Sequence, residues 1–169
     1  MELLGVGFLL GILGAGFGAV LAQHIEDRAV DGRLRAALLA EVEENLVRLG
    51  HPDQATGIGR APIVRSAWDA ARSIRLKAEQ SAAVAKAYSS GDRLRLTGEV
   101  LDATIANITQ PNDYTVGQTR MKALSMLEAN RIAYALFEAA RFALGGAEPT
   151  LNADQLIAER LAAVKAAGL

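Results

Sequence analysis

The chain has 169 residues, of which 51% are hydrophobic, and its 18 basic and 19 acidic residues give a formal net charge of −1. This balanced charge argues against a nucleic-acid-binding protein, which would carry a basic surface, and against a polybasic segment that binds a membrane surface. Cysteine is absent from the sequence, which excludes disulfides, thiolate metal sites and a cysteine nucleophile.

An apolar run opens the chain. Residues 3–22 carry no charged side chain and include six glycines. A helix of this length rises about 30 Å, the thickness of the hydrocarbon core of a bilayer. The sequence therefore predicts a transmembrane anchor at residues 1–23. A cleaved signal peptide is the alternative, because small residues precede Gln23, but the usual basic segment before the apolar run is missing.

Small residues recur along one face of the predicted anchor at intervals of four, three and four residues, which places them within about 60° on a helical wheel. Because glycine lets two membrane helices approach closely, such a face is typical of a helix–helix interface. We expect it to bind a helix of an integral membrane partner or of a second copy of the chain. The predicted interface consists of Gly7, Gly11, Gly14, Ala15, Gly18 and Ala22.

Basic residues follow the anchor but do not precede it. Arg28, Arg33 and Arg35 come shortly after the apolar run. The excess of basic residues in cytoplasmic segments of membrane proteins places the following domain in the cytoplasm and Met1 outside. We therefore expect a single-pass protein that lies in a bacterial inner membrane.

The remaining residues, 24–169, show the apolar spacing of helices rather than the alternation of strands. We predict an all-α fold in which the transmembrane helix precedes a soluble up-down bundle of four to five helices. The first bundle helix begins near residue 27 or 33 and ends at Leu49. Only Gly32 interrupts its path back to the anchor, so the two can form one continuous helix.

The other expected helices are marked by their ends. Asn152, followed three residues later by Gln155, predicts the capped start of the last helix. Gly145 and Gly146 predict the end of the helix before it. Residues 89–92 are either a turn or a weak point within a helix, because the apolar pattern resumes after them. The expected helices cover residues 63–74, 79–108, 116–144 and the segment after Asn152.

Few side chains suggest a catalytic role or a site for a metal or cofactor. His24, beside the predicted membrane interface, is a weak candidate ligand for a metal or a pigment cofactor, and contact with headgroups or with a neighbouring subunit is favoured. His51 is expected in a solvated turn. Glu41, Glu43 and Glu44 cluster on the first bundle helix. Carboxylate metal sites in bundles combine them with Glu-x-x-His pairs, which this sequence lacks. We therefore interpret the cluster as a solvated face and expect neither metal nor cofactor.

Asparagines lie on or beside the apolar faces of three predicted helices. Asn45, Asn107 and Asn130 are predicted to fix helix register through buried hydrogen bonds rather than to take part in catalysis. The glycine-rich residues 57–60 do not follow a predicted strand, so they do not predict a nucleotide-binding loop.

These features predict a non-catalytic accessory or structural subunit of a larger integral membrane complex, for example a photosynthetic or respiratory one. The anchor would dock through its small-residue face, and the helical domain would brace partners on the cytoplasmic side. The alternative is a homo-oligomeric single-pass signalling or adaptor protein that recruits soluble partners. A tethered enzyme with a site of dispersed residues is a third possibility that the sequence supports least.

Overall fold

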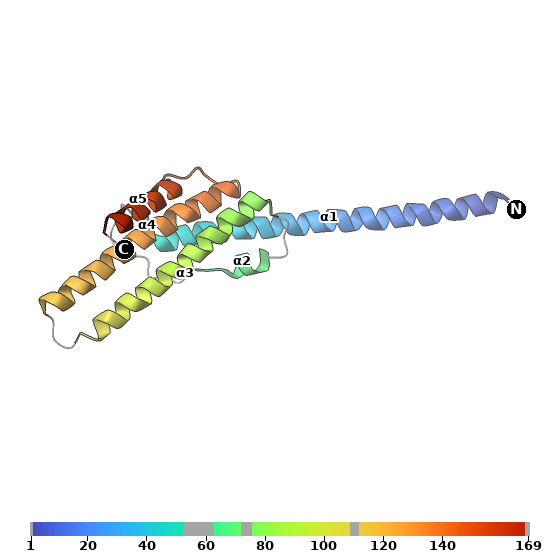
Figure 1. Ribbon diagram of the computed structural model, residues 1–169. Helices are drawn as coiled ribbons and strands as arrows, with labels where there is room; N and C mark the ends of the chain where they lie inside the picture. Colours follow the sequence, from blue (N-terminus) through green and yellow to red (C-terminus); the bar gives the residue numbers. More distant parts are fainter. Residues whose placement is uncertain (1, 53–62, 72–75, 109–111, 168–169) are drawn as a thin grey trace.

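The computed structural model confirms the all-α prediction (Figure 1). It describes residues 2–52, 63–71, 76–108 and 112–167, with residues 2–21 and 113 described by their backbone alone. The described residues contain no strand. The helices are α1 (Glu2–Leu49), α2 (Ser66–Ala70), α3 (Ala78–Ala106), α4 (Asp113–Ala143) and α5 (Ala153–Ala166).

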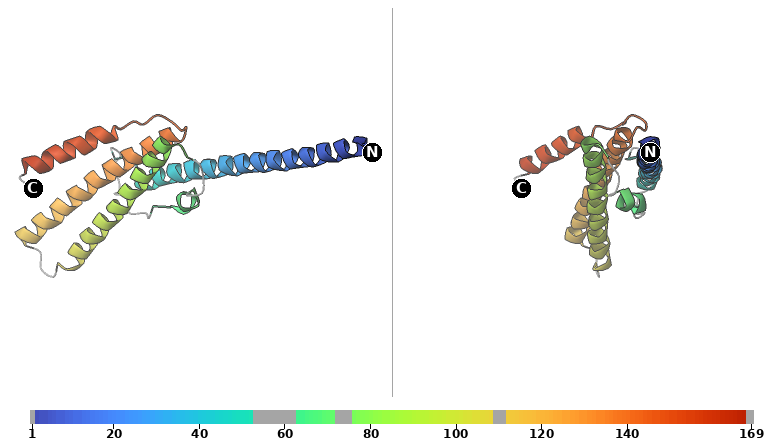
Figure 2. Two further views of the ribbon diagram at one scale, coloured as in Figure 1. Left: turned by 45° about the vertical axis from the view of Figure 1, so that its right-hand side comes forward. Right: turned by 90° about the vertical axis from the view of Figure 1, so that its right-hand side faces the viewer.

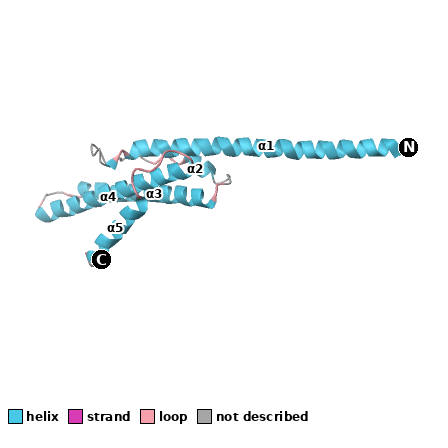
Figure 3. Cartoon of the chain, turned by 90° about the horizontal axis from the view of Figure 1, so that it is seen from above, coloured by secondary structure: helices cyan, strands magenta, loops and turns pink. Residues whose placement is uncertain are grey.

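The first helix consists of two very different parts. Its N-terminal part extends far beyond the other helices, and residues 22–30 are exposed to solvent (Figures 1 and 3). Its C-terminal part contributes Leu38, Val42 and Leu49 to the hydrophobic core. A Cβ atom added at Gly32 would meet nothing within 4 Å, so this glycine is not required by packing and the helix runs through it unbroken.

Helix α4 is the centre of the domain, because it packs against α1, α3 and α5. Helices α3 and α4 form an antiparallel hairpin (Figure 1). The hairpin turns into α4 through a reciprocal cap: the Asn112 side chain accepts the N–H of Thr115 at 2.8 Å, and the Thr115 hydroxyl accepts the N–H of Asn112 at 2.9 Å. Such a cap satisfies two donors that the first helical turn would otherwise leave unpaired.

The end of α4 and the start of α5 lie where the sequence predicts them. Gly145 has a φ of +97°, a left-handed conformation that glycine adopts without steric cost. Asn152 caps α5, since its side chain accepts the N–H of Gln155 at 3.0 Å. Helix α5 contacts α4 but diverges from the hairpin toward its far end (Figure 2).

Three aromatic rings connect the middle of the domain. Trp68 of α2 stacks on Tyr88 of α3, with ring centroids 5.5 Å apart, and Tyr88 meets the edge of Phe137 of α4 at 5.3 Å. Phe137 is fully buried and Tyr88 nearly so. Burial of large aromatic surfaces makes this stack a main contribution to the packing of α2 and α3 on the rest of the domain.

The structure corrects one predicted boundary and decides between two alternatives for residues 89–92. The helix expected at residues 63–74 is reduced, within the described residues, to the five residues of α2. The candidate turn at residues 89–92 lies inside α3, which continues through it. A Cβ at Gly91 would lie 2.9 Å from Ile63 Cγ1, so this glycine permits close approach of a neighbouring segment and does not mark a turn.

The part of the chain that the structure describes contains no helix both long and apolar enough to cross a membrane. The predicted anchor at residues 1–23 and most of its small-residue face lie at residues whose side chains are outside that part. The anchor and its orientation therefore stay predictions.

Candidate functional site

The residues singled out in the sequence do not come together in one place. Gly7, Gly11, Gly14, Ala15 and Gly18 belong to the α1 backbone, but what surrounds them lies outside the described residues. Ala22 and His24, further along the same helix, are exposed. His51 is half-buried, with its ring 5.2 Å from that of Tyr134 in an edge contact, so it is only partly solvated.

The Glu41 carboxylate, on the bundle part of α1, accepts hydrogen bonds from four donors. Only 5% of Glu41 is exposed, so the prediction of a solvated face is wrong for this residue, whereas Glu43 and Glu44 are exposed. Oε2 accepts the Ser66 hydroxyl at 2.9 Å and the Ala67 N–H at 2.6 Å. Burying a charge is costly unless it is well hydrogen-bonded, and this carboxylate is.

The second oxygen of Glu41 completes the arrangement. Oε1 accepts the Trp68 N–H at 3.0 Å and the Tyr88 hydroxyl at 2.5 Å. The carboxylate thus caps the first turn of α2 and also binds α3, so a single side chain of α1 holds two other elements. Two carboxylate oxygens offer about four acceptor positions, and all of them are used by the protein itself.

The surroundings of Glu41 also set its protonation. Burial raises the pKa of Glu41, but the hydrogen bonds from Tyr88, from the Ala67 and Trp68 N–H groups and from Ser66 together hold the pKa below its ordinary value of 4.5. Burial, together with the hydrogen bond to Glu41 and its charge, raises the pKa of Tyr88 well above 10.0. Both groups stay in one protonation state near neutral pH, as a structural contact requires.

Asn45 extends this contact by one helical turn. Its amide nitrogen donates to the Val64 carbonyl at 2.7 Å, and its oxygen accepts the Val64 N–H at 2.8 Å. Asn45 is fully buried, as predicted. Glu41 and Asn45, four residues apart on one face of α1, therefore fix the segment that leads into α2.

The other two asparagines differ. Asn130 is buried, as predicted, and donates to the carbonyl of Leu49 at 3.4 Å, where α1 ends. Asn107 is exposed and forms the C-cap of α3, so its predicted burial is wrong. An apolar pattern in the sequence does not distinguish a helix interior from the last exposed turn of a hairpin.

A second buried carboxylate, Glu138, was not expected from the sequence. It accepts the N–H groups of Thr150 and Leu151, each at 3.0 Å, and the Thr150 hydroxyl. Arg141 forms an ion pair with it at 3.3 Å. The available signal was the position of Glu138 beside Phe137 on an apolar face, three residues before a basic residue. Glu138 fixes the start of the segment that carries α5.

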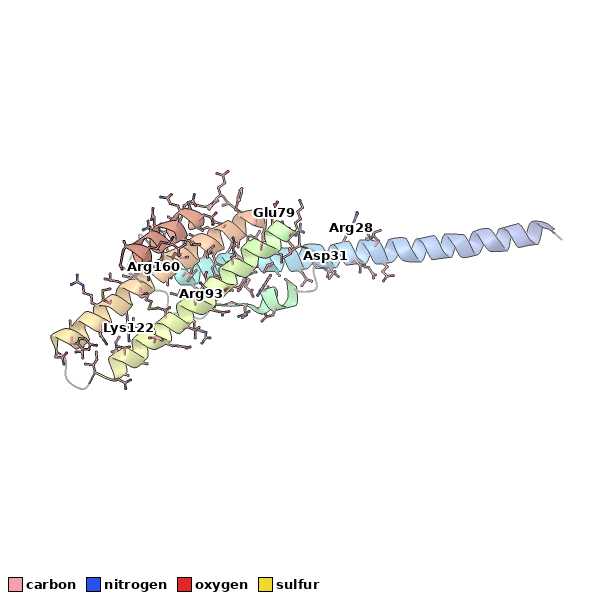
Figure 4. The ribbon with its side chains drawn as sticks, in the orientation of Figure 1. Arg28, Asp31, Glu79, Arg93, Lys122 and Arg160 are labelled. Atoms are coloured by element: carbon pink, nitrogen blue, oxygen red, sulfur yellow. The ribbon has the colours of Figure 1, made fainter. Side chains whose placement is uncertain are left out.

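An open groove of about 720 Å³ lies between α3, α4 and α5. Its floor is apolar and comes from α4 and α5, including Ala129, Ile132 and Ile157. Along α3 it is bordered by Lys86 and Arg93, and on the α5 side by Arg160, which pairs with Glu128 of α4. Figure 4 labels Arg93 and Arg160 on these two helices. No sequence pattern indicated this groove, because it depends on the angle of α5.

Among the described residues, no group of three or more potential ligands could hold a metal ion. The chain matches no family model, and comparisons with curated proteins and with solved structures gave no significant match.

Proposed function

We propose that the chain is a non-catalytic accessory subunit of an integral membrane protein complex. In this proposal residues 1–23 cross the bilayer, the face formed by Gly7, Gly11, Gly14, Ala15, Gly18 and Ala22 packs against a partner helix, and the α2–α5 domain braces the complex on the cytoplasmic side.

The observation that carries the proposal is the continuity of α1. The helix that contains the apolar N-terminal segment also supplies Leu38, Val42 and Leu49 to the core of the domain. Between these parts, residues 23–37 would span about 22 Å as a helix. A continuous helix transmits position and rotation, so an anchor bound to a partner would hold the domain at a set distance and orientation.

The polar groups of the domain support a structural role. Glu41 uses its acceptor positions on Ser66, Ala67, Trp68 and Tyr88. A carboxylate that acts as a general base needs an acceptor position free for the proton it removes. Glu41 instead joins the anchor helix to the elements it would carry.

Purification of the full chain from its native membrane in a mild detergent, followed by quantitative mass spectrometry, tests the proposal. We expect integral membrane proteins in fixed stoichiometry with the chain. Substituting Gly11→Ile and Gly14→Ile should abolish this association, because a branched side chain blocks close helix packing. The matched control is Leu9→Ile with Leu13→Ile, on the opposite side of the helical wheel, which should leave it intact.

Two outcomes would overturn the proposal. Recovery of the chain only as a homodimer would support the self-associating adaptor instead. Unchanged partner recovery in the Gly11→Ile, Gly14→Ile variant would exclude the small-residue face as the interface.

The continuous helix gives a second test. Two alanines inserted after Gly32 rotate the domain by about 200° relative to the anchor. An insertion of seven helix-forming residues adds almost two full turns, so it changes the facing direction of the domain by only about 20°. If the domain must face its partner, the two-residue insertion should weaken association more than the longer one. Equal effects would show that orientation is not transmitted.

A further inference from the structure

We infer that the groove between α3, α4 and α5 binds an acidic amphipathic helix of a partner protein. The inference goes beyond the proposed function and does not depend on how α1 docks. It rests on the shape of the groove, its apolar floor and the charge of its borders.

The shape fits a helix. Helices α3 and α5 both pack on α4, yet no Cα atom of α3 lies within 8 Å of a Cα atom of α5. The lining positions on α3 run from Ala85 to Thr97 and those on α4 from Ser125 to Leu136, which are lengths of about 18 Å and about 16 Å along the two helices. A guest helix laid over α4 between α3 and α5 would complete a four-helix arrangement.

The floor offers the apolar contacts that such a helix needs. Ala129, Ile132 and Ile157 line it and are only partly buried, and Leu161 on its α5 border is 56% exposed. Amphipathic helices bind grooves of this kind by inserting side chains spaced three and four residues apart. Small Ala85 and Ala129 leave room for larger side chains of the guest.

The charges specify the guest. Lys86, Arg93 and Arg160 line the groove against one carboxylate, Glu128, which Arg160 already neutralises. Lys86 and Arg93 are exposed side chains about two turns apart on α3. Complementary charge gives an interface its specificity and speeds association. A helix with carboxylates beside its apolar stripe would place them along this border.

A neighbouring hollow limits where those carboxylates can lie. Lys86 also borders a cavity of about 550 Å³ that carries Glu79 and Asp154, at the end of the groove where α5 begins. Acidic residues of the guest that extended past Lys86 would meet like charge. The guest therefore carries its acidic residues opposite Lys86 and Arg93 and neutral or basic residues beyond them.

A designed peptide is the direct probe. It has about 14 residues, with leucine and alanine on one face and glutamate on both borders, and it carries a fluorescent label. Binding to the full chain in a nonionic detergent is followed by fluorescence anisotropy, with detergent alone as the blank. We expect saturable binding of this peptide and none of the same peptide with lysine in place of glutamate.

Paired variants locate the binding. Lys86→Glu combined with Arg93→Glu should lower the affinity for the acidic peptide by about tenfold or more. The matched control is Arg120→Glu with Arg131→Glu, which makes the same change in net charge at exposed positions of α4 outside the groove. This control should change affinity by less than about twofold, since distant exposed charges are screened by salt. Circular dichroism verifies that each variant is folded.

The milder Lys86→Gln with Arg93→Gln serves if the charge reversal disturbs folding, and it should also weaken binding. Equal affinity for the acidic and basic peptides, or equal effects of the groove and control variants, would overturn the inference. So would absence of peptide binding together with binding of oleate that the groove variant abolishes, because the occupant would then be an anionic amphiphile.

Discussion

The domain has two connections that are held in similar ways but serve different parts of the molecule. The first turn of α2 is bound by Glu41 of α1, and the segment leading into α5 is bound by Glu138 of α4. Both carboxylates are buried and both accept two consecutive backbone N–H groups. In each connection a buried carboxylate thus replaces water as the acceptor of backbone N–H groups, and Asn45 adds a second contact just before α2.

The difference lies in how the negative charge is stabilised. Glu138 has a cation beside it, Arg141 at 3.3 Å. Glu41 forms no ion pair in the part of the chain that the structure describes and depends on N–H and hydroxyl donors. Glu41 couples the proposed anchor helix to the domain, whereas Glu138 fixes the start of α5 and so one border of the groove. Substitutions at the two positions should therefore have separable effects.

The largest effect is expected for Glu41→Gln. The amide keeps one acceptor oxygen but directs its NH₂ group at donors that need an acceptor, so we expect a loss of about 3 kcal/mol in the free energy of unfolding. Urea unfolding of the full chain in a mild nonionic detergent, followed by the fluorescence of Trp68, measures it. Trp68 is the only tryptophan and lies in α2, so its emission reports this connection directly.

Glu43→Gln is the matched control on the exposed face of α1, with an expected change in the free energy of unfolding within about 0.5 kcal/mol.

The dependence of stability on acid pH gives a second measurement. Because the pKa of Glu41 is lowered on folding, its contribution is present above pH 4.5 and is lost as the pH falls through the folded pKa. The importance of this contact would be contradicted if Glu41→Gln lost as little free energy of unfolding as Glu43→Gln. It would also be contradicted if Glu41→Gln kept the acid sensitivity of the wild type.

Glu138→Gln should cost less, about 2 kcal/mol. Arg141 retains a partner in the carbonyl of Glu148, so the cation is not left wholly unpaired. Binding of the acidic peptide should weaken because α5 is no longer fixed, while Trp68 emission in the folded state should not change. Glu148→Gln, at an exposed position, is the control. A changed Trp68 emission would show that the two connections are not independent.

The comparison also shows what the sequence could reveal. The cap at Asn152 and the stop at Gly145 depend on residues close in sequence, so the end of α4 and the start of α5 could be expected. The Asn112 cap is equally local, but the start of α4 was expected at residue 116, three residues after its observed start. Glu41 was assigned to a solvated face because its partners lie at least 25 residues away. Its spacing of four from Asn45 was the only local signal.

The groove was beyond sequence reasoning for a related reason. Its borders come from three helices, and its existence depends on the divergence of α5 from α3 (Figure 2). The periodicity of each helix shows which residues face inward, but not the angle between two helices. In the sequence, Lys86 and Arg93 look like part of an ordinary solvated helix face. Only the position of α5 shows that both residues border one groove.

A smaller effect is expected for Tyr88→Phe. The substitution keeps the stacking with Trp68 and Phe137 and removes only the hydroxyl that donates to Glu41 at 2.5 Å. We expect a loss of about 1 kcal/mol at pH 7, the net value of one hydrogen bond to a charged group with three donors remaining. Urea unfolding with Trp68 fluorescence measures it, and a loss as large as that of Glu41→Gln would show that the hydroxyl, rather than the α2 backbone, dominates.

The smallest effect concerns alkaline pH. The pKa of Tyr88 is raised on folding above its ordinary value of 10.0, so above pH 10 the unfolded chain releases this proton while the folded chain keeps it. Stability that is complete below pH 10 is therefore lost as the pH rises, by about 0.4 kcal/mol at pH 10 itself. Tyr88→Phe should lack this loss, so the stability difference between wild type and variant should narrow from pH 7 to pH 10.

Tyr114→Phe, at an exposed tyrosine, controls for the other groups that titrate in this range and should keep the wild-type pH dependence. If Tyr88→Phe also kept it, the Tyr88 proton would be released equally in the folded and unfolded chains. Glu41 would then hold α2 without a contribution from Tyr88, through the Ser66 hydroxyl and the Ala67 and Trp68 N–H groups. Its contact would differ from that of Glu138 mainly by the absence of a cation.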